Sequence, residues 1–158
     1  LIAMRAATMP NSPALDFARF LPYRLSVLSN TISQDIASEY EQRFGLSVTQ
    51  WRVMAILGRH DDLAARDVAQ RTAMDKVAVS RAVAGLIEDD LVSRKIAPND
   101  RRESRLRLTT AGRRIHDQIV PLALEHERRL LERLDTEEQR WLMRILDRLQ
   151  PSPEPEGD

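Results

Sequence analysis

One short stretch, residues 91–108, interrupts the helical periodicity that dominates the rest of this sequence. Two runs within it are β-branched or alternate between apolar and polar residues, and the turn-forming Pro98-Asn99-Asp100 lies between them, which predicts a hairpin. On both sides of this stretch apolar residues recur at spacings of three and four, as they do along one face of a helix. The chain is therefore expected to be mainly α, with a single two-stranded ribbon.

The helices expected around the ribbon have recognisable ends. Most begin at a proline or at a side chain that can cap a helix: Pro22, Ser47 with Gln50, Asp75, Thr109 or Thr110, and Asp135 with Glu138. Gly45 is expected to close the first helix and Pro151 to stop the last one. A short helix without a strong cap is expected over residues 65–71.

Residues 66–91 have the proportions of a helix–turn–helix motif. A supporting helix is followed by the turn Thr72-Ala73-Met74 and by a second helix capped by Asp75. In that motif the second helix enters the major groove of DNA and places its N-terminal residues on base edges. The candidate base-contacting residues are Lys76, Ala78, Ser80 and Arg81. Because short helix pairs are common, the motif alone does not establish DNA binding.

The ribbon is strongly basic in a chain whose 24 basic and 24 acidic residues otherwise balance. Residues 91–108 hold six basic residues against two acidic ones, and a thin ribbon cannot bury so much charge. The basic residues either form a solvated edge that prevents strand pairing, or a wing that reaches the minor groove and flanking phosphates. The position directly after a helix–turn–helix favours the wing. Its candidate DNA-binding residues are Arg94, Lys95, Asp100, Arg101, Arg102 and Arg105.

The outer helices carry more apolar surface than a small winged domain needs. They can bury it in an intramolecular bundle or against a second copy of the chain, and the second alternative is favoured because the winged domain separates them in sequence. We therefore expect residues 14–46 and 110–149 to form an intertwined helical dimerisation domain and residues 47–109 a winged helix–turn–helix domain. Residues 1–13 and 150–158 are expected to be flexible ends.

The run from Trp51 through Gly112 resembles the MarR family of bacterial transcriptional regulators. The resemblance depends on an ordered set of segments: Gln50-Trp51-Arg52-Val53, Asp75 through Val83, Leu91-Val92-Ser93-Arg94, Asp100-Arg101-Arg102 and Leu108-Thr109-Thr110-Ala111-Gly112. It implies a homodimer in which both chain ends form the interface. It also implies a wing in which Asp100 braces Arg102 for insertion into the minor groove, and a repressor that binds a pseudo-palindromic operator.

This sequence departs from the family pattern at Asp90, where glycine is usual before Leu91. Aspartate tolerates a left-handed backbone less well than glycine. Together with Glu88 and Asp89 it also opposes the helix dipole at a C-terminus. We expect a less stable end to the second helix of the motif, without loss of the fold.

The resemblance further implies a small effector, since family members often bind aromatic acids, phenols or thioesters and then release DNA. The residues that could line such a pocket are Tyr23, Ser29, Asn30, Trp51 and Arg52. Arg52 could hold a carboxylate through two parallel hydrogen bonds. Alternatively, Trp51 belongs to the core and Arg52 pairs with an acidic side chain.

Other classes of function have little support in the sequence. The chain has no cysteine, which excludes disulfides, thiolate metal sites and cysteine redox sensing. Its three histidines match no compact metal-ligand spacing and no catalytic motif is recognisable, so no enzyme, metal or cofactor is expected. No apolar run approaches the roughly 20 residues that span a bilayer, so a cytoplasmic protein is expected. The main alternative function is a helical protein-interaction module without specific DNA binding.

Overall fold

The computed structural model describes residues 15–72, 74–97 and 100–150, and at 97 and 100–103 it describes the backbone alone. The predicted N-terminal arm, the turn residues 98–99 and the tail 151–158 lie outside this part. No helix within it is long and apolar enough to cross a membrane. Residues 15–35 and 36–150 form separate compact units.

Residues 15–35 comprise a short turn and the first half of helix α1 (Leu21–Phe44), with Pro22 in its first helical turn as predicted. The ring of Phe17 meets that of Tyr23 edge to face, with centroids 5.5 Å apart. This unit exposes eight large apolar side chains: Leu15, Phe17, Phe20, Leu21, Tyr23, Leu25, Val27 and Leu28. A surface of this composition is typical of a segment that becomes buried against another chain.

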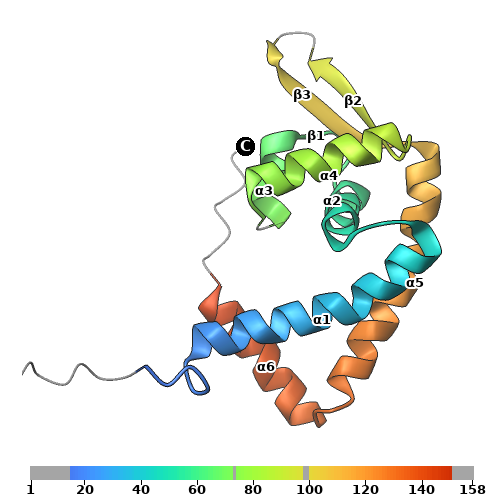
Figure 1. Ribbon diagram of the computed structural model, residues 1–158. Helices are drawn as coiled ribbons and strands as arrows, with labels where there is room; N and C mark the ends of the chain where they lie inside the picture. Colours follow the sequence, from blue (N-terminus) through green and yellow to red (C-terminus); the bar gives the residue numbers. More distant parts are fainter. Residues whose placement is uncertain (1–14, 73, 98–99, 151–158) are drawn as a thin grey trace, which may run out of the picture. The chain divides into compact units, whose positions relative to one another are not determined.

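Residues 36–150 form a winged helix followed by two further helices (Figure 1). The elements after the end of α1 are α2 (Val48–Arg59), β1 (Leu63–Ala64), α3 (Ala65–Thr72), α4 (Lys76–Glu88), β2 (Val92–Ala97), β3 (Asp100–Leu108), α5 (Thr110–Leu131) and α6 (Thr136–Leu149). Helices α2, α3 and α4 lie together, and the β2–β3 hairpin extends beyond them. The predicted mainly α fold, with a winged helix–turn–helix and a two-stranded wing, is confirmed, whereas the association of the outer helices into a dimerisation domain stays a prediction.

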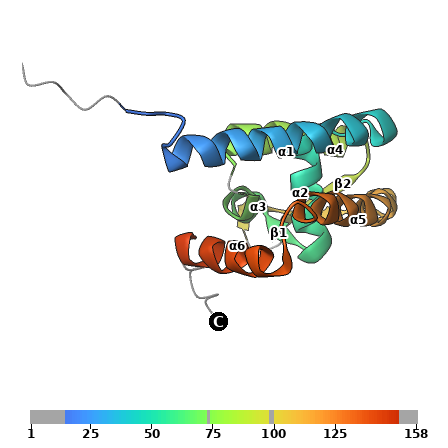
Figure 2. The ribbon, with the colours of Figure 1, turned by 90° about the horizontal axis from the view of Figure 1, so that it is seen from below.

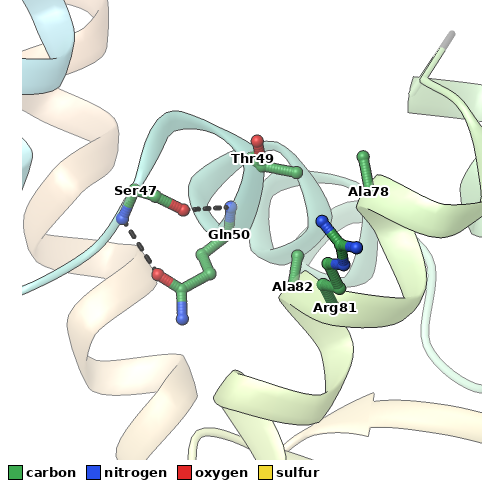
Figure 3. A pocket seen from close by; sticks show the side chains of 6 residues that line it. All are labelled: Ser47, Thr49, Gln50, Ala78, Arg81 and Ala82. Carbon is green, nitrogen blue, oxygen red and sulfur yellow. Dashed lines mark hydrogen bonds between the residues drawn. The ribbon is translucent and has the colours of Figure 1, made fainter.

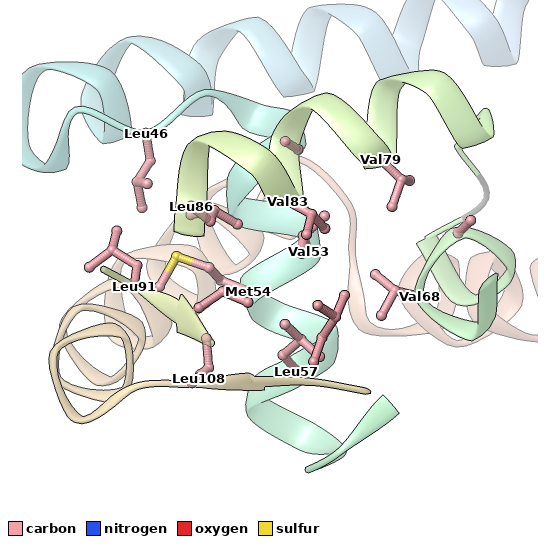
Figure 4. Packing of buried hydrophobic residues seen from close by; sticks show 14 of the residues in the cluster. Leu46, Val53, Met54, Leu57, Val68, Val79, Val83, Leu86, Leu91 and Leu108 are labelled. Atoms are coloured by element: carbon pink, nitrogen blue, oxygen red, sulfur yellow. The ribbon is translucent and has the colours of Figure 1, made fainter. Parts of the chain in front are cut away.

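The core of this unit is mainly aliphatic, with Tyr40 as a buried aromatic residue, and most of it lies between α2, α3, α4 and the sheet (Figure 4). Val53, Met54 and Leu57 of α2 face Val83 and Leu86 of α4, and all five are essentially inaccessible to solvent. Burial of each such side chain contributes about 1.5–3 kcal/mol. The core therefore fixes which face of α4 points inward, and by default which face points outward.

The predicted helix starts at Ser47, Thr109 and Asp135 are confirmed by hydrogen bonds. Ser47 and Gln50 form a reciprocal capping box at α2, and Asp135 and Glu138 form another at α6. The hydroxyl of Thr109 accepts from the backbone N–H of Gly112 at 2.9 Å and so caps α5. These caps satisfy backbone donors that would otherwise lack a partner at the start of each helix.

The predicted hairpin is also confirmed, with Val92 opposite Leu108 and Arg94 opposite Leu106. A third strand, β1, pairs antiparallel with β3 and places Leu63 opposite Leu106, so the sheet order is β1-β3-β2. The sequence pattern did not indicate this strand, because two residues are too few to show any alternation. Strand β1 ties the base of the wing to the end of α2.

Asp90 ends α4 in a left-handed conformation, with a φ of 56°. The N–H of Leu91 donates to the carbonyl of Leu86 at 2.8 Å, and the N–H of Asp90 donates to that of Ile87 at 3.1 Å. This is the Schellman arrangement, in which glycine is the usual residue at the left-handed position. The left-handed backbone expected at Asp90 is therefore present, and an aspartate occupies a position that favours glycine.

We expect Asp90→Gly to stabilise the folded protein by about 0.5–1 kcal/mol, because relief of the left-handed strain outweighs the greater flexibility of the unfolded chain. Thermal denaturation measures the change. Asp89→Gly is the matched control, since Asp89 has a φ of −81° and glycine relieves no strain there. Equal stability of the two variants would contradict the assignment.

Helices α5 and α6 leave the winged helix and diverge from the turn that joins them (Figures 1 and 2). Pro121 lies inside α5, which is a single helix on both sides of it. His126 is satisfied by Glu39 of α1, with Nε2 2.7 Å from Oε2. Helix α6 has no buried residue, and Trp141, Ile145 and Leu149 are each about half exposed. Its apolar face is therefore not covered within residues 36–150.

Candidate nucleic-acid interface

Helix α4 is held so that its N-terminal turn is presented to solvent. The carboxylate of Asp75 accepts hydrogen bonds from the backbone N–H groups of Val77 and Ala78 at 3.0 and 2.9 Å, which caps the helix. Val79 and Val83 anchor the same helix in the core. Because the cap and the core fix both the start and the rotation of α4, the side chains on its outer face have a defined direction.

Three of the four predicted base-contacting residues lie on that outer face. Lys76, Ser80 and Arg81 are exposed, whereas Ala78 is half-buried. Val77, which is 59% exposed in the first turn of the same helix, was not among the predicted residues. The sequence did contain a sign of this exposure, because Val77 is apolar but does not fall on the helical face that holds Val79 and Val83. An exposed valine beside two cations is suited to contact with a thymine methyl group.

A shallow pocket lies between the outer side of α4 and the first turn of α2 (Figure 3). Ser47, Thr49 and Gln50 line it from α2 and its cap, and Ala78, Arg81 and Ala82 line it from α4. The dashed lines in the figure mark the capping box between Ser47 and Gln50, which holds that turn of α2 in shape. Arg81 thus lies beside the hydroxyl groups of Ser47 and Thr49, on the outer face of α4.

The wing residues divide into two groups. Arg94 and Lys95 on β2 are exposed, as predicted. Arg105 on β3 is instead paired with Asp62, with Nε 3.4 Å from Oδ2, and Arg107 shares the same carboxylate, with Nη2 3.2 Å from Oδ1. The charge of these two arginines faces outward, as expected, but the carboxylate of Asp62 partly neutralises it.

The tip of the wing is described only by its backbone. Asp100, Arg101 and Arg102 belong to strand β3, so Asp100 starts a strand and does not lie in the turn, as the sequence had suggested. Their side chains lie outside the described part of the structure. The roles assigned to them from the family resemblance stay predictions.

The turn that precedes β1 has a marked electrostatic character. Hydrogen bonds from Arg107, together with smaller effects of Arg105, hold the pKa of the Asp62 carboxyl below its ordinary value despite some desolvation. The neighbouring Asp61 accepts from Nη2 of Arg113 on α5 at 2.9 Å, and Nη1 of Arg113 donates to the carbonyl of Gly58 at 2.7 Å. Two successive aspartates therefore connect this turn to different elements, one to the wing and the other to α5.

The acidic residues Glu88, Asp89 and Asp90 are all exposed at the C-terminal end of α4. Lys76 and Arg81 occupy the opposite half of that helix. Since DNA attracts cations and repels carboxylates, this polarity favours docking of α4 through its N-terminal half.

The predicted effector residues fall in two separate units. Tyr23, Ser29 and Asn30 are exposed on α1 within residues 15–35. Trp51 and Arg52 are half-buried on α2. The structure therefore does not test whether the five residues share a pocket.

Trp51 itself packs against the core. Its ring meets Tyr40 edge to face at 5.6 Å and lies tilted over His116 at 5.8 Å. Burial, with a smaller effect of the neighbouring Glu39, raises the pKa of Tyr40 to about 12. The Tyr40 hydroxyl is accordingly protonated at neutral pH, and it makes no hydrogen bond within the described residues. As for metals, the described part of the chain holds no group of three or more His, Cys, Asp or Glu side chains close enough to bind an ion.

The chain is similar to known DNA-binding regulators in sequence and in fold. A family model described as "MarR family" matches residues 44–103. A curated relative, the uncharacterized HTH-type transcriptional regulator YdgJ of Bacillus subtilis, is 28% identical over 121 residues, which are 75% of this chain and 72% of the relative.

Solved structures agree with this match. A MarR/EmrR family transcriptional regulator from Acinetobacter sp. ADP1 superposes with a TM-score of 0.78 at 27% identity, covering 85% of this chain and 95% of that one. The MepR–DNA complex of S. aureus gives a TM-score of 0.75 at 23% identity, covering 82% and 96%. The first structure is similar in both sequence and fold, and the second is similar in fold.

Proposed function

The chain belongs to the MarR family of transcriptional regulators, and from that premise we propose that it binds a pseudo-palindromic operator as a homodimer and represses transcription. The observation that carries the proposal is the outward face of α4, where Lys76, Val77, Ser80 and Arg81 are exposed in the half of the helix that enters the major groove. The solved complex of MepR with DNA supports it by similarity of fold.

The proposed contacts divide by the chemistry of each side chain. Arg81 and Lys76 can donate to guanine, Ser80 can bond to either kind of base, and Val77 can contact a thymine methyl group. Arg94 and Lys95 on the exposed strand of the wing are suited to backbone phosphates, which position the protein without reading sequence. Arg105 can reach DNA only by giving up its ion pair with Asp62.

The proposed dimer is formed by the two ends of the chain. Residues 15–28 and helix α6 both expose large apolar side chains, as a dimerisation domain would before it meets its partner. Two winged helices related by a two-fold axis would then meet half-sites about one helical turn apart. Sedimentation equilibrium measures the mass of the protein in solution and so tests whether it is a dimer.

The proposed effector is a small aromatic acid, phenol or thioester whose binding releases the DNA. This part follows from the family resemblance together with the carboxylate-binding chemistry of Arg52. A ligand that binds the folded state raises the melting temperature by mass action. A thermal-shift screen of aromatic acids and their thioesters, repeated with Arg52→Ala, tests it.

The experiment that tests the proposed function is a gel shift on the DNA upstream of the protein's own gene, with salt varied. A regulator should prefer one site over scrambled DNA, and its affinity should fall steeply with salt. Equal binding to all sequences, or none at all, would favour the alternative of a helical protein-interaction module, for which the exposed face of α6 is the supporting observation.

Replacement of Arg102 by alanine is expected to weaken operator binding by about tenfold or more, because the wing loses the side chain assigned to the minor groove. The dimer should persist, since the wing lies far in sequence from both chain ends. Arg102→Lys is the control: it keeps the charge but lacks the planar guanidinium, so it should recover only part of the affinity. Unchanged affinity in Arg102→Ala would contradict the assignment of the wing tip.

A further inference from the structure

Asp62 occupies an unusual position at the base of the wing. Its backbone is left-handed, with a φ of 65°, and it immediately precedes the short strand β1. Because Leu63 is opposite Leu106 in the β1–β3 ladder, Asp62 extends the register to the level of Arg107. The carboxylate thus meets Arg107 across the sheet and Arg105 on the diagonal, and it contacts both guanidinium groups.

The two arginines share one face of β3. Leu106 and Leu108 alternate with them and are buried, so Arg105 and Arg107 lie on the outer face of the sheet. The three charged side chains are 38–44% exposed. A phosphate group can therefore approach the guanidinium groups, but it meets a carboxylate already in place.

We propose that Asp62 is a specificity-determining residue, which holds Arg105 and Arg107 in an intramolecular ion-pair cluster and thereby limits binding to DNA of arbitrary sequence. This inference rests on the proposed DNA-binding function and concerns only its balance between specific and non-specific contacts. A phosphate must displace the carboxylate before it gains either arginine. The two cations therefore contribute less to counterion release than their number suggests.

The alternative role for Asp62 is to hold the wing in place. The backbone ladder already does this, since residues 104–108 of β3 are paired with β2, and Arg105 and Leu106 are also paired with β1. Half-exposed ion pairs contribute little to stability in comparison, because water screens them and two long side chains lose freedom. The main consequence of the cluster is thus electrostatic.

Restriction of non-specific binding is useful to a regulator. An operator competes with a vast excess of other DNA, so occupancy depends on the ratio of specific to non-specific affinity. The outer face of α4 carries the residues proposed to read sequence, whereas Arg105 and Arg107 lie on the sheet, outside that face. Neutralising these two arginines raises the ratio of specific to non-specific affinity and leaves the sequence-reading residues of α4 unchanged.

The test measures binding to a fluorescent duplex of about 25 base pairs of arbitrary sequence, by anisotropy, at salt concentrations from about 50 to 200 mM. Asp62→Asn is compared with Asp61→Asn, which removes the same charge from the adjacent residue but frees Arg113 on α5 in place of the wing arginines. A second pair of proteins carries Arg105→Gln and Arg107→Gln, with and without Asp62→Asn. Circular dichroism and the melting temperature confirm that each variant is folded.

In Asp62→Asn we expect the non-specific affinity at 0.1 M salt to rise about three- to tenfold, with a salt slope steeper by about 0.9–1.8, which corresponds to one or two additional phosphate contacts. Asp61→Asn should show neither effect, and Asp62→Asn should have no effect when both arginines are glutamine. The Arg105→Gln, Arg107→Gln protein with Asp62 intact should keep nearly the wild-type slope.

Three outcomes would overturn the proposal. Asp62→Asn could match Asp61→Asn, its gain could persist without the two arginines, or it could lose affinity for every duplex, as a residue that holds the wing in place would. If Asp62→Asn does not fold, a markedly shallower slope in the protein with both glutamines decides against the proposal by itself. Wild-type protein that binds no duplex, even at low salt, would instead overturn the proposed function, and the inference about Asp62 with it.

Discussion

Replacing Gly112 by alanine is expected to destabilise the folded protein by about 3 kcal/mol or more, which lowers the melting temperature by about 6–12 °C. A Cβ atom at this position would lie 2.0 Å from the carbonyl oxygen of Leu91 and 2.9 Å from its carbonyl carbon. Both atoms belong to the backbone, so no change of rotamer can relieve the clash. The first turn of α5 would have to move away from the base of the wing.

That movement would break a connected set of hydrogen bonds. The Leu91 carbonyl accepts from the N–H of Thr109 at 3.0 Å, and the Thr109 hydroxyl donates to the carbonyl of Asp90 at 2.6 Å. The same hydroxyl caps α5 through the N–H of Gly112. One methyl group therefore disturbs the end of α4, the start of β2 and the cap of α5 together.

Thermal denaturation at equal protein concentration measures the effect, because the melting temperature of the proposed dimer would depend on concentration. Gly85→Ala is the matched control. A Cβ there would meet only the Nε2 atom of Gln50, at 3.0 Å, and alanine is the better helix former inside α4. The control should therefore be close to neutral or stabilising. A Gly112→Ala protein as stable as the control would show that α5 and the wing base do not pack as described.

Replacing Arg81 by alanine is expected to change the sequence preference of the protein, with a loss of about 1–3 kcal/mol, or about 5- to 150-fold, at the base pair that Arg81 contacts. Arg81 is exposed on the outer face of α4, which the cap of Asp75 and the buried Val83 hold in one orientation. An arginine held in this way can present its guanidinium group as a bidentate donor to guanine.

Arg94→Ala is the matched control, because it removes the same side chain from an exposed position on the wing. A phosphate contact carries no sequence information, so this variant should weaken binding to all duplexes alike, with a salt slope shallower by about 0.9. Selection of binding sites from a randomised operator, followed by affinity measurements, separates the two outcomes. The groove assignment fails if both variants reduce affinity equally for every sequence.

Much of the winged helix was predictable because its signals are local. The apolar stripe of α4, Val79, Val83 and Leu86, recurs with the period of a helix, and a capping side chain acts on backbone groups within three residues. The unusual helix end at Asp90 was predictable for the same reason. Such features depend only on residues that are close together along the chain, so the sequence is enough to predict them.

The strand β1 and the ion-pair cluster of Asp62 were not predictable in this way. Leu63 and Asp62 find their partners on β3, some forty residues further along the chain. A run of two residues shows no alternation, and an aspartate beside a second aspartate resembles an ordinary helix end. The exposure of Val77 was not predicted, because the base-contacting candidates in the helix–turn–helix motif were chosen mainly for their polar side chains.

By itself the sequence determined the order of the helices and of the β2–β3 hairpin, where the helices start, the inward face of α4 and the basic character of the wing. The physical reason is that hydrophobic periodicity and backbone capping act within a few residues. Only the tertiary structure decided which basic residues are available to a partner. Arg94 is exposed, whereas Arg105 and Arg107 are held by a carboxylate from a distant turn. A carboxylate neutralises an arginine only when the two are close in space. Asp62 comes close to Arg105 and Arg107 only because the folded sheet places it beside β3.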